Sequence, residues 1–430
     1  MRKILVLSYF FPPCPLTASN RVFGIVSNLH KFGFYPIVVT RHWDQQNDTP
    51  DALLKSTSNI IEHKIYDGYE VYYLPYKSSL RDRFLIKSQQ NKYYAILSKV
   101  LTFVQLLTEP FSNYFVPFSN LYDFSKQFLR LNKDVKLLFI SANPFIQFKF
   151  GYHLSKKFNI EWIADYRDSW TTNKMAYNIR FFNRITHKFF RFFEKKWVNS
   201  SFFFTSVSDK YVYGIQRIIK VKGYTIYNGF NEIKNFPEFS NTDDFNILYA
   251  GNLYFSQPVE KFISFLKSNN FTFNKKKVNL HFAGLGFDEK QTKRILDFTN
   301  EFHTNINIYS WLSTVEYEAL LMQSDLLLML PYIGFKGIPT SKLFDYISTK
   351  KNILLFGSDH DIIEQILLSS KLGFVSNNEN DVKNFIINLI NYKSNSSNFL
   401  KSEEIDIEKY SIDFQVNNLS LLINSLLIKK

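Results

Sequence analysis

The sequence predicts an α/β protein with two domains, each built on a mostly parallel β-sheet. Short apolar runs of strand type alternate with segments of helical periodicity, a pattern typical of parallel sheets covered by helices. The alternation stops at a polar segment without periodicity, residues 229–244, and then starts again. The chain has 430 residues, which is enough for two ordinary domains. We therefore expect a linker at residues 229–244 between two similar α/β domains.

The first domain is expected to span residues 1–228. It opens with a strand at residues 3–8, a loop, a helix at residues 20–32 and a strand at residues 36–40. Further strands are expected at residues 70–74, 135–140, 160–164, 202–205 and 224–227, and further helices at residues 120–131, up to residue 158 and after Ser208. Ligands of parallel sheets bind beyond the carboxyl ends of the strands, so the first loop, with Pro13 and Arg21, should border a cleft.

Residues 78–117 interrupt this alternation and predict a helical insertion. Basic residues are interspersed there with apolar and aromatic ones: Arg81, Arg83, Lys87, Lys92 and Lys99. Two interpretations stay open. The insertion is either an ordinary helix that covers the domain or a flap that faces a substrate or a membrane.

Polar residues follow two successive strands of the first domain. The segment Ser141-Ala-Asn-Pro, which contains Asn143, is expected as a turn after one strand, and Asp165, Arg167 and Asp168 directly follow the next. Charges in this position favour a site at the mouth of a cleft, since ligands of open parallel sheets bind there. The alternative is an internally paired Arg–Asp cluster that pins the loop.

Residues 178–197 predict a basic amphipathic helix. At about 100° per residue, the basic side chains fall in one stripe: Arg180, Arg184, His187, Lys188, Arg191 and Lys195. Aromatic residues cover the other side. Such a helix can lie at an anionic membrane surface, whereas a helix whose Phe face covers the sheet is the simpler alternative. We take the second interpretation as the default, with part of the helix free to contact lipid.

The second domain is expected at residues 245–410, followed by residues 411–430, whose helix could pack back on the first domain. Strands are expected at residues 245–249, 278–282, 306–308, 326–330, 353–356 and 374–375. Helices are expected at residues 258–267, 314–322 and 361–368, from residue 381 onward, and at residues 414–428. The Asn- and Ser-rich residues 391–398 are expected as a loop.

A loop between two apolar runs of the second domain leads into a helix that is expected to begin near Ser341. Pro339 suits a helix start, and Thr340 and Ser341 can cap it. The N–H groups of the first turn and Lys342 would suit a phosphate, and Asp345, one turn later, could accept a hydrogen bond from a ribose hydroxyl. A capped helix with an exposed salt pair is the alternative.

The composition narrows the class of partner. The formal net charge of +14 favours an anionic partner: a nucleic acid, an anionic lipid or a phosphorylated substrate. No module of basic and aromatic residues recurs, so we expect no nucleic-acid partner. The one cysteine, Cys14, excludes an internal disulfide and fits a reducing compartment. The sequence shows neither Cys/His metal spacings nor a P-loop.

The sequence also bears on location. The first apolar run is too short for a signal peptide, and no uncharged run approaches the roughly 20 residues of a membrane span. We therefore expect a cytoplasmic protein that could be peripheral on the inner face of the cell membrane.

In their order and spacing, several segments resemble family-four glycosyltransferases of the GT-B fold over nearly the whole chain. They are residues 4–13 with Arg21, residues 141–144, residues 163–170 with an Asp-aromatic-Arg-Asp-x-Trp pattern, and residues 227–230, 249–254 and 337–347. The resemblance implies two Rossmann-like domains that face each other across a cleft. It also implies a retaining transferase that uses a nucleotide sugar, UDP- or GDP-linked, with no metal and no other cofactor.

The resemblance assigns roles to residues of this sequence. The donor diphosphate would contact a loop and the first turn of a helix: Lys336, Gly337, Pro339, Thr340, Ser341 and Lys342. Asp345 would bind the ribose, and Gly251 and Asn252 would face the phosphates. The reacting centre would contain three charged residues: Asp165, Arg167 and Asp168. The acceptor side would contain three residues of the first domain: Arg21, Pro13 and Asn143.

Three departures from the family pattern leave two functions open. Gly337 stands where many members have a first acid, Asn252 where an Arg is usual, and Asp165 where many members have a His. We expect a glycosyltransferase of cell-surface polysaccharide biosynthesis, such as that of lipopolysaccharide or capsule, with a glycan or lipid-linked acceptor. The alternative is a non-catalytic GT-B-like partner protein in a polysaccharide assembly complex.

Overall fold

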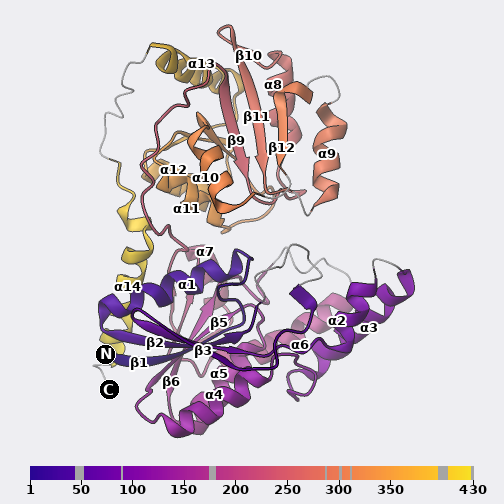
Figure 1. The fold of residues 1–430 in the computed structure, drawn as a ribbon, viewed down its shortest axis with the longest axis vertical. Helices are drawn as coiled ribbons and strands as arrows, with labels where there is room; N and C mark the ends of the chain where they lie inside the picture. The colour runs from indigo at the N-terminus through magenta and orange to yellow at the C-terminus, as the bar shows by residue number, and fades with distance from the viewer. Residues whose placement is uncertain are drawn as a thin grey trace. The chain divides into compact units, whose positions relative to one another are not determined.

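The computed structural model describes residues 1–43, 53–88, 91–173, 181–285, 288–299, 303–309, 312–395 and 405–427. The chain forms two compact units, Met1–Asn228 with Ile412–Lys430, and Gly229–Ser411. Each unit is an α/β domain built around a mostly parallel sheet (Figure 1). The structure therefore confirms the predicted fold class of two parallel-sheet domains.

The sheet of the first unit has the strand order β3-β4-β2-β1-β5-β6-β7-β8. Its strands are β1 (Arg2–Ser8), β2 (Phe34–Arg41), β3 (Glu62–Tyr66), β4 (Tyr69–Leu74), β5 (Leu137–Ala142), β6 (Glu161–Tyr166), β7 (Phe203–Ser206) and β8 (Gly223–Thr225). All neighbours are parallel except β3, which pairs antiparallel with β4. Because successive side chains of a strand point to opposite faces, Leu5 and Leu7 enter one core and Ile4 and Val6 the other.

Helices cover both faces of this sheet. They are α1 (Ala18–Leu29), α4 (Asn120–Leu131), α5 (Gln147–Phe158), α6 (Phe181–Val198), α7 (Asp209–Gln216) and α14 (Ile412–Leu427). The core that contains Leu5 and Leu7 includes residues of α4, α5 and α6, and the opposite core includes residues of α1 and α14. The last helix therefore belongs to the first unit, where the Ile412 side chain leaves no room for a Cβ at Gly24 of α1.

The insertion is helical, as predicted for residues 78–117. It forms α2 (Leu80–Lys87) and α3 (Lys92–Thr108). A capping box begins α2, because the Ser79 hydroxyl accepts from the Asp82 N–H and the Asp82 carboxylate accepts from the Ser79 N–H. The segment from α3 to α4 then returns the chain to the sheet.

The helix predicted at residues 178–197 is described as α6, with side chains from Ile185 onward. Phe190, Phe193 and Trp197 are buried in the core of the first unit. The helix therefore covers the sheet, in agreement with the default interpretation. Residues 178–180, with Arg180, and the side chain of Arg184 lie outside what the structure describes.

The sheet of the second unit has the order β10-β11-β9-β13-β14-β15, with β12 also paired to β11. Its strands are β9 (Phe245–Ala250), β10 (Thr272–Phe273), β11 (Lys276–Ala283), β12 (Ile306–Tyr309), β13 (Leu326–Met329), β14 (Ile353–Phe356) and β15 (Gly373–Ser376). Its helices are α8 (Val259–Ser268), α9 (Glu289–Thr299), α10 (Thr314–Met322), α11 (Ser341–Ser348), α12 (Ile362–Ser369) and α13 (Glu379–Asn395). The pairs are parallel except β10 with β11.

Residues 229–244 are irregular and are anchored to the second unit. The fully buried Lys351 ammonium donates to the carbonyl oxygens of Pro237 at 2.7 Å and of Ser324 at 2.6 Å. The Asp325 carboxylate accepts from the Ser240 N–H at 2.6 Å and from the Lys393 ammonium at 2.9 Å. Buried charges that are hydrogen-bonded in this way fix an irregular segment to the strands beneath it.

The predictions differ from the structure at five places. The antiparallel strands β3 and β10 were not predicted, because most β3 side chains are exposed and β10 has two residues. Ser141 and Asp165 belong to β5 and β6 rather than to the following loops. The predicted loop at residues 391–398 is also wrong in part, since α13 continues to Asn395, and residues 396–398 lie outside the described ranges.

Candidate functional site

Two glycines of the candidate site in the second unit follow the carboxyl ends of parallel strands. Gly251 follows β9 and Gly284 follows β11, both with φ of 85°. A Cβ added to Gly251 would lie 3.5 Å from Cε and 3.8 Å from Nζ of Lys342, and one added to Gly284 would lie 3.5 Å from the backbone of Gly251. The absence of side chains at these glycines leaves space in front of the Lys342 ammonium, so a ligand can approach the backbone closely.

Lys342 is buried, with 8% of its surface exposed. Its ammonium lies 3.7 Å from the centroid of the Tyr249 ring and, within the described chain, makes no hydrogen bond. Burial lowers the pKa of Lys342 well below its usual value. A buried amine without a hydrogen-bond acceptor is costly, so this side chain is suited to meet an anion.

The first turn of α11 supplies N–H groups next to Lys342. The helix begins at Ser341, as predicted, with Thr340 at the N-cap in an extended conformation. The Thr340 hydroxyl makes no capping bond and, among the described residues, is buried without a partner. The N-terminus of α11 is thus not closed by its own cap, which leaves it suited to a phosphate.

Two aspartates hold the loop before α11. The Asp361 carboxylate accepts from the Gly337 N–H, and the Lys336 ammonium donates to the Asp359 carbonyl. The Asp359 carboxylate in turn accepts from the N–H groups of Ile363 at 3.0 Å and Glu364 at 3.1 Å. Neither aspartate was among the predicted site residues, although their place just before a helix is a capping signal.

Asp345 lies one turn after Lys342 and is half-buried. Burial raises its pKa to about 6, and the nearby Lys234 ammonium opposes this rise. No described residue donates a hydrogen bond to this carboxylate, so both oxygens remain available as acceptors. The next residue fixes the helix to β9: the Tyr346 hydroxyl accepts from the Ala250 N–H at 2.7 Å and donates to the Leu248 carbonyl at 3.3 Å.

Asn252 is exposed, and its carbonyl accepts from the Tyr249 hydroxyl at 2.9 Å. This bond ties the Gly251–Asn252 turn to the ring that underlies the Lys342 ammonium. The structure thus brings together Gly251, Lys342 and the start of α11, whereas the Lys336 ammonium points to the Asp359 backbone. The assignment of these residues to a donor stays a prediction.

In the first unit, Asp165 and Arg21 form a buried ion pair. The Arg21 guanidinium donates to the Asp165 carboxylate through Nη2 at 2.7 Å and Nε at 3.1 Å. The same carboxylate accepts from the hydroxyls of Ser141 at 2.8 Å and Thr205 at 2.7 Å. Asp165 has no exposed surface. The pair therefore links α1 to the ends of three neighbouring strands.

The other predicted residues of the first unit are more accessible. Arg167 donates to Asp168 at 2.5 Å, and both are partly exposed. Asn143 is exposed beyond the end of β5, and Pro13 is half-buried in the loop after β1. The charged residues thus separate into a buried pair, Arg21 with Asp165, and an accessible pair.

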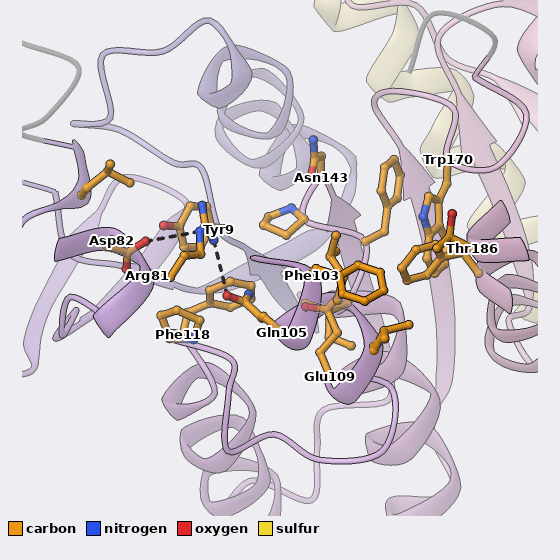
Figure 2. A pocket seen from close by; sticks show the side chains of 18 of the residues that line it. Tyr9, Arg81, Asp82, Phe103, Gln105, Glu109, Phe118, Asn143, Trp170 and Thr186 are labelled. Atoms are coloured by element: carbon orange, nitrogen blue, oxygen red, sulfur yellow. Dashed lines mark hydrogen bonds and ion pairs between the residues drawn. The ribbon is translucent and has the colours of Figure 1, made fainter. Parts of the chain in front are cut away.

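The first unit also contains a pocket of about 580 Å³ (Figure 2). Aromatic and apolar side chains make up most of its wall, among them Tyr9, Phe103, Phe118, Phe145, Trp170 and Phe190. Its polar side chains are Arg81, Asp82, Gln105, Glu109, Asn143 and Thr186. Sequence reasoning named Asn143 but missed the pocket, because α3 and the strand ends that form it are distant in sequence.

The charges of this pocket are unusual. Burial raises the pKa of Glu109 to about 7, and burial lowers the pKa of the neighbouring Lys149 to about 8. Arg81 Nη1 lies 3.5 Å from Gln105 Oε1, and Arg81 Nε lies 3.9 Å from Asp82 Oδ1 (Figure 2). A largely apolar pocket with a few convergent polar groups is the usual form of a small-molecule site.

Two broader properties concern metals and membranes. Across the described ranges, no three His, Cys, Asp or Glu side chains are grouped to hold a metal ion. Every helix that the structure describes falls short of the length or the hydropathy that a membrane span needs.

Comparison with known proteins establishes the fold. No protein-family model and no curated protein matches the sequence. A glycosyltransferase from Rickettsia africae is 11% identical, with 99% of this chain and 98% of that chain covered and a TM-score of 0.60. The lipopolysaccharide outer core galactosyltransferase WaaB is 12% identical, with 98% and 99% covered and a TM-score of 0.54. HepE of Anabaena, in complex with UDP-glucose, is 10% identical, with 98% and 99% covered and a TM-score of 0.57. The chain has the GT-B fold of two Rossmann-like domains.

Proposed function

We propose that this chain is a glycosyltransferase of cell-surface polysaccharide biosynthesis that moves a sugar, with retention, from a nucleotide-sugar donor to a glycan or lipid-linked acceptor. One observation carries the proposal: the buried Lys342 ammonium has no hydrogen-bond partner in the described chain and lies at the uncapped start of α11. A diphosphate would supply the missing negative charge. The fold shared with a galactosyltransferase and with a protein in complex with UDP-glucose supports a nucleotide sugar.

The donor is proposed to bind to the second unit. Lys342 and the N–H groups of Ser341 and Lys342 bind the diphosphate, which approaches over Gly251 and Asn252. Asp345 accepts from the ribose hydroxyls, for which it has free acceptor atoms. Lys336, Gly337, Pro339 and Thr340 shape the loop, and Asp361 holds it through the Gly337 N–H.

The same groups can assist the chemical step. When the bond between C1 of the sugar and the diphosphate oxygen breaks, negative charge develops on the diphosphate. Lys342 and the start of α11 stabilise this charge, so the step requires no metal. The acceptor hydroxyl attacks C1 from the same face, and its proton passes to the leaving phosphate. Configuration is thereby retained without a protein nucleophile.

The acceptor is proposed to bind to the first unit, in the pocket that Asn143 and Trp170 border. Arg167 and Asp168 act near the reacting sugar, and Pro13 lies in a bordering loop. Arg21 and Asp165 act as positioning residues, since the carboxylate is fully buried and hydrogen-bonded. We place this reaction in the cytoplasm, where nucleotide sugars would reach the second unit.

Nucleotide binding followed by turnover tests the proposal. UDP and GDP are titrated calorimetrically, and the purified chain is then incubated with a panel of nucleotide sugars and glycan or lipid-linked acceptors. We expect one nucleotide to bind and its sugar to be transferred with the donor's anomeric configuration, as read by NMR of the product. A chain that binds no nucleotide overturns the proposal. Binding without transfer to any acceptor favours the non-catalytic partner, which the uncharged Gly337 and Asn252 suggest.

A further inference from the structure

We propose that the insertion of the first unit is a docking surface for an anionic membrane. The surface, called here the insertion surface, consists of exposed apolar side chains of α2, α3 and the segment after α3: Leu80, Leu85, Tyr93, Ile96, Val100, Val104, Phe111, Tyr114 and Phe115. This inference concerns attachment and does not depend on the proposed transfer reaction.

One stripe of α3 is apolar and faces solvent. Tyr93, Ile96, Val100 and Val104 follow each other at intervals of three or four residues, so they share one side of the helix. Tyr93 is 62% exposed, Ile96 61% and Val100 53%. A surface helix normally turns its apolar stripe to the core, so this stripe needs a partner.

Another side of α3 packs on the protein. Ser98 is buried, and the centroid of the Tyr94 ring lies 5.6 Å from that of the Phe84 ring of α2. Further along the helix, Phe103 and Leu107 line the pocket of the first unit. These contacts account for part of the apolar surface of α3 but not for its exposed stripe.

The segment after α3 continues the surface. Phe111 is 73% exposed and Tyr114 is 86% exposed. The Phe111 ring lies edge-on to the Phe193 ring of α6, with 5.3 Å between centroids, so this segment is held against α6. Exposed Ile185 and Phe192 of α6 add to the apolar area.

The charges around the insertion surface favour an anionic bilayer. In the described part of residues 80–115, the exposed charged side chains are all basic: Arg83, Lys87, Lys92 and Lys99. Asp82 is buried, and Glu109 lines the pocket. On α6, Lys188, Lys195 and Lys196 are exposed as well. Apolar side chains flanked by lysines are the composition of interfacial membrane helices.

The same charges argue against a second copy of this chain as the partner. A symmetric dimer through this surface would bring the lysines of two copies together, and like charges facing each other are unfavourable. Anionic headgroups instead neutralise the lysines while the acyl region receives the apolar stripe. Because α3 also lines the pocket, docking would bring the pocket close to the bilayer.

Flotation with vesicles of phosphatidylcholine, with and without phosphatidylglycerol, tests the proposal on the full chain. The wild type should float with anionic vesicles at low salt. The triple variant Ile96→Ser, Val100→Ser, Val104→Ser should lose binding by about tenfold or more, because it removes apolar area from the membrane contact. The matched control, Leu131→Ser, Val315→Ser, Leu368→Ser, changes three exposed apolar residues elsewhere and should bind like the wild type.

Two charge-reversal variants isolate the electrostatic contribution to vesicle binding. Lys92→Glu with Lys99→Glu should weaken binding to anionic vesicles, whereas Lys261→Glu with Lys277→Glu, which makes the same change of net charge on the second unit, should not. Equal loss in both variants would show that net charge alone drives binding and would overturn a defined surface.

A fluorescent label gives a direct readout. Cys14 is buried and its pKa is raised to about 11, so a cysteine introduced by Val100→Cys can be labelled selectively. The emission of an environment-sensitive fluorophore attached there should shift to the blue when anionic vesicles are added. The emission of the same fluorophore at Val315→Cys should not shift. Absence of flotation, or equal shifts at both positions, overturns the proposal. So does a concentration-dependent dimer that the triple serine variant dissociates.

Discussion

The Lys342 ammonium of α11 lies 3.7 Å from the centroid of the Tyr249 ring of β9. This cation–π contact is the polar support that the described chain offers to an amine that burial otherwise penalises. Tyr249 also donates to the Asn252 carbonyl, so the ring cannot move without disturbing the turn beside Gly251. The free protein therefore holds an amine ready for an anion at a cost in its own stability.

Replacing Lys342 should consequently stabilise the free protein. Lys342→Met keeps most of the side-chain volume and removes the buried amine, so we expect a higher Tm without ligand. The folded-state pKa lies below the unfolded one, so wild-type stability rises with pH until the unfolded amine also loses its proton. The difference in Tm should therefore narrow toward alkaline pH. Calorimetry of both proteins between pH 6 and about 10 measures this.

The same variant should lose nucleotide binding. UDP should raise the Tm of the wild type but not that of Lys342→Met. The control, Lys383→Met, replaces an exposed lysine of the same unit, and UDP should raise its Tm as well. If Lys342→Met binds UDP as the wild type does, the phosphate role of Lys342 is wrong even if the Tm rises.

Asp345→Asn, like Lys342→Met, should gain stability and lose nucleotide binding. Burial raises the Asp345 pKa to about 6, above that of an unfolded aspartate, so the ionised carboxylate costs stability at pH 8. The asparagine variant should be more stable there, by up to about 2 kcal/mol. This advantage should shrink as pH falls from 6 toward the pKa of an unfolded aspartate, about 3.9, because the folded wild-type carboxylate takes up a proton in that range. Denaturant unfolding at pH 8 and pH 5 checks the sign.

The UDP affinity of Asp345→Asn should fall, whereas its stability rises. The Asp345→Asn variant keeps one acceptor atom but loses the charge, so UDP affinity at pH 8 should fall by about tenfold, as expected for loss of a charged hydrogen bond. Asp381→Asn, an exposed change in the same unit, serves as the control. Unchanged UDP affinity together with the expected gain in stability would remove the ribose role while leaving the burial argument intact.

The sequence predicted local structure well and long-range pairing poorly. The helix start at Ser341 follows from Pro339 and Thr340, and strand β14 follows from an apolar run, because both signals lie within a few residues. The pair of Arg21 with Asp165 joins residues 144 positions apart, so one sequence does not reveal it. Asp165 therefore looked like a loop residue.

A second miss has a similar cause. Asp361 holds the Gly337 N–H from a different strand end, a contact that needs the folded sheet. For the insertion, a covering helix and a flap both stayed open, since periodicity shows that an apolar stripe exists but not which way it faces. The two parallel-sheet domains were predicted because they depend on the order of elements, which a sequence does display.

Asp361 should act as a positioning residue for the loop before α11. Asp361→Ala removes the acceptor of the Gly337 N–H, so the loop loses its anchor and UDP affinity should fall, by about tenfold. Asp361→Asn retains a side-chain oxygen that can accept the same hydrogen bond and should restore most of the affinity. A direct role in binding the donor would instead make both variants equally poor, which calorimetric titration with UDP can distinguish.

The buried pair of Arg21 and Asp165 should govern the stability of the first unit. Asp165→Asn leaves the Arg21 guanidinium buried without its counter-charge, and such losses cost about 3–5 kcal/mol. Because the chain has two units, calorimetry should show a lower transition temperature for the first unit only. UDP binding to the second unit should be unchanged. Asp168→Asn, at a partly exposed position, should change stability by less than about 1 kcal/mol and reduce transfer instead. The opposite pattern, in which Asp165→Asn abolishes transfer at wild-type stability, would make Asp165 a catalytic residue and refute its positioning role.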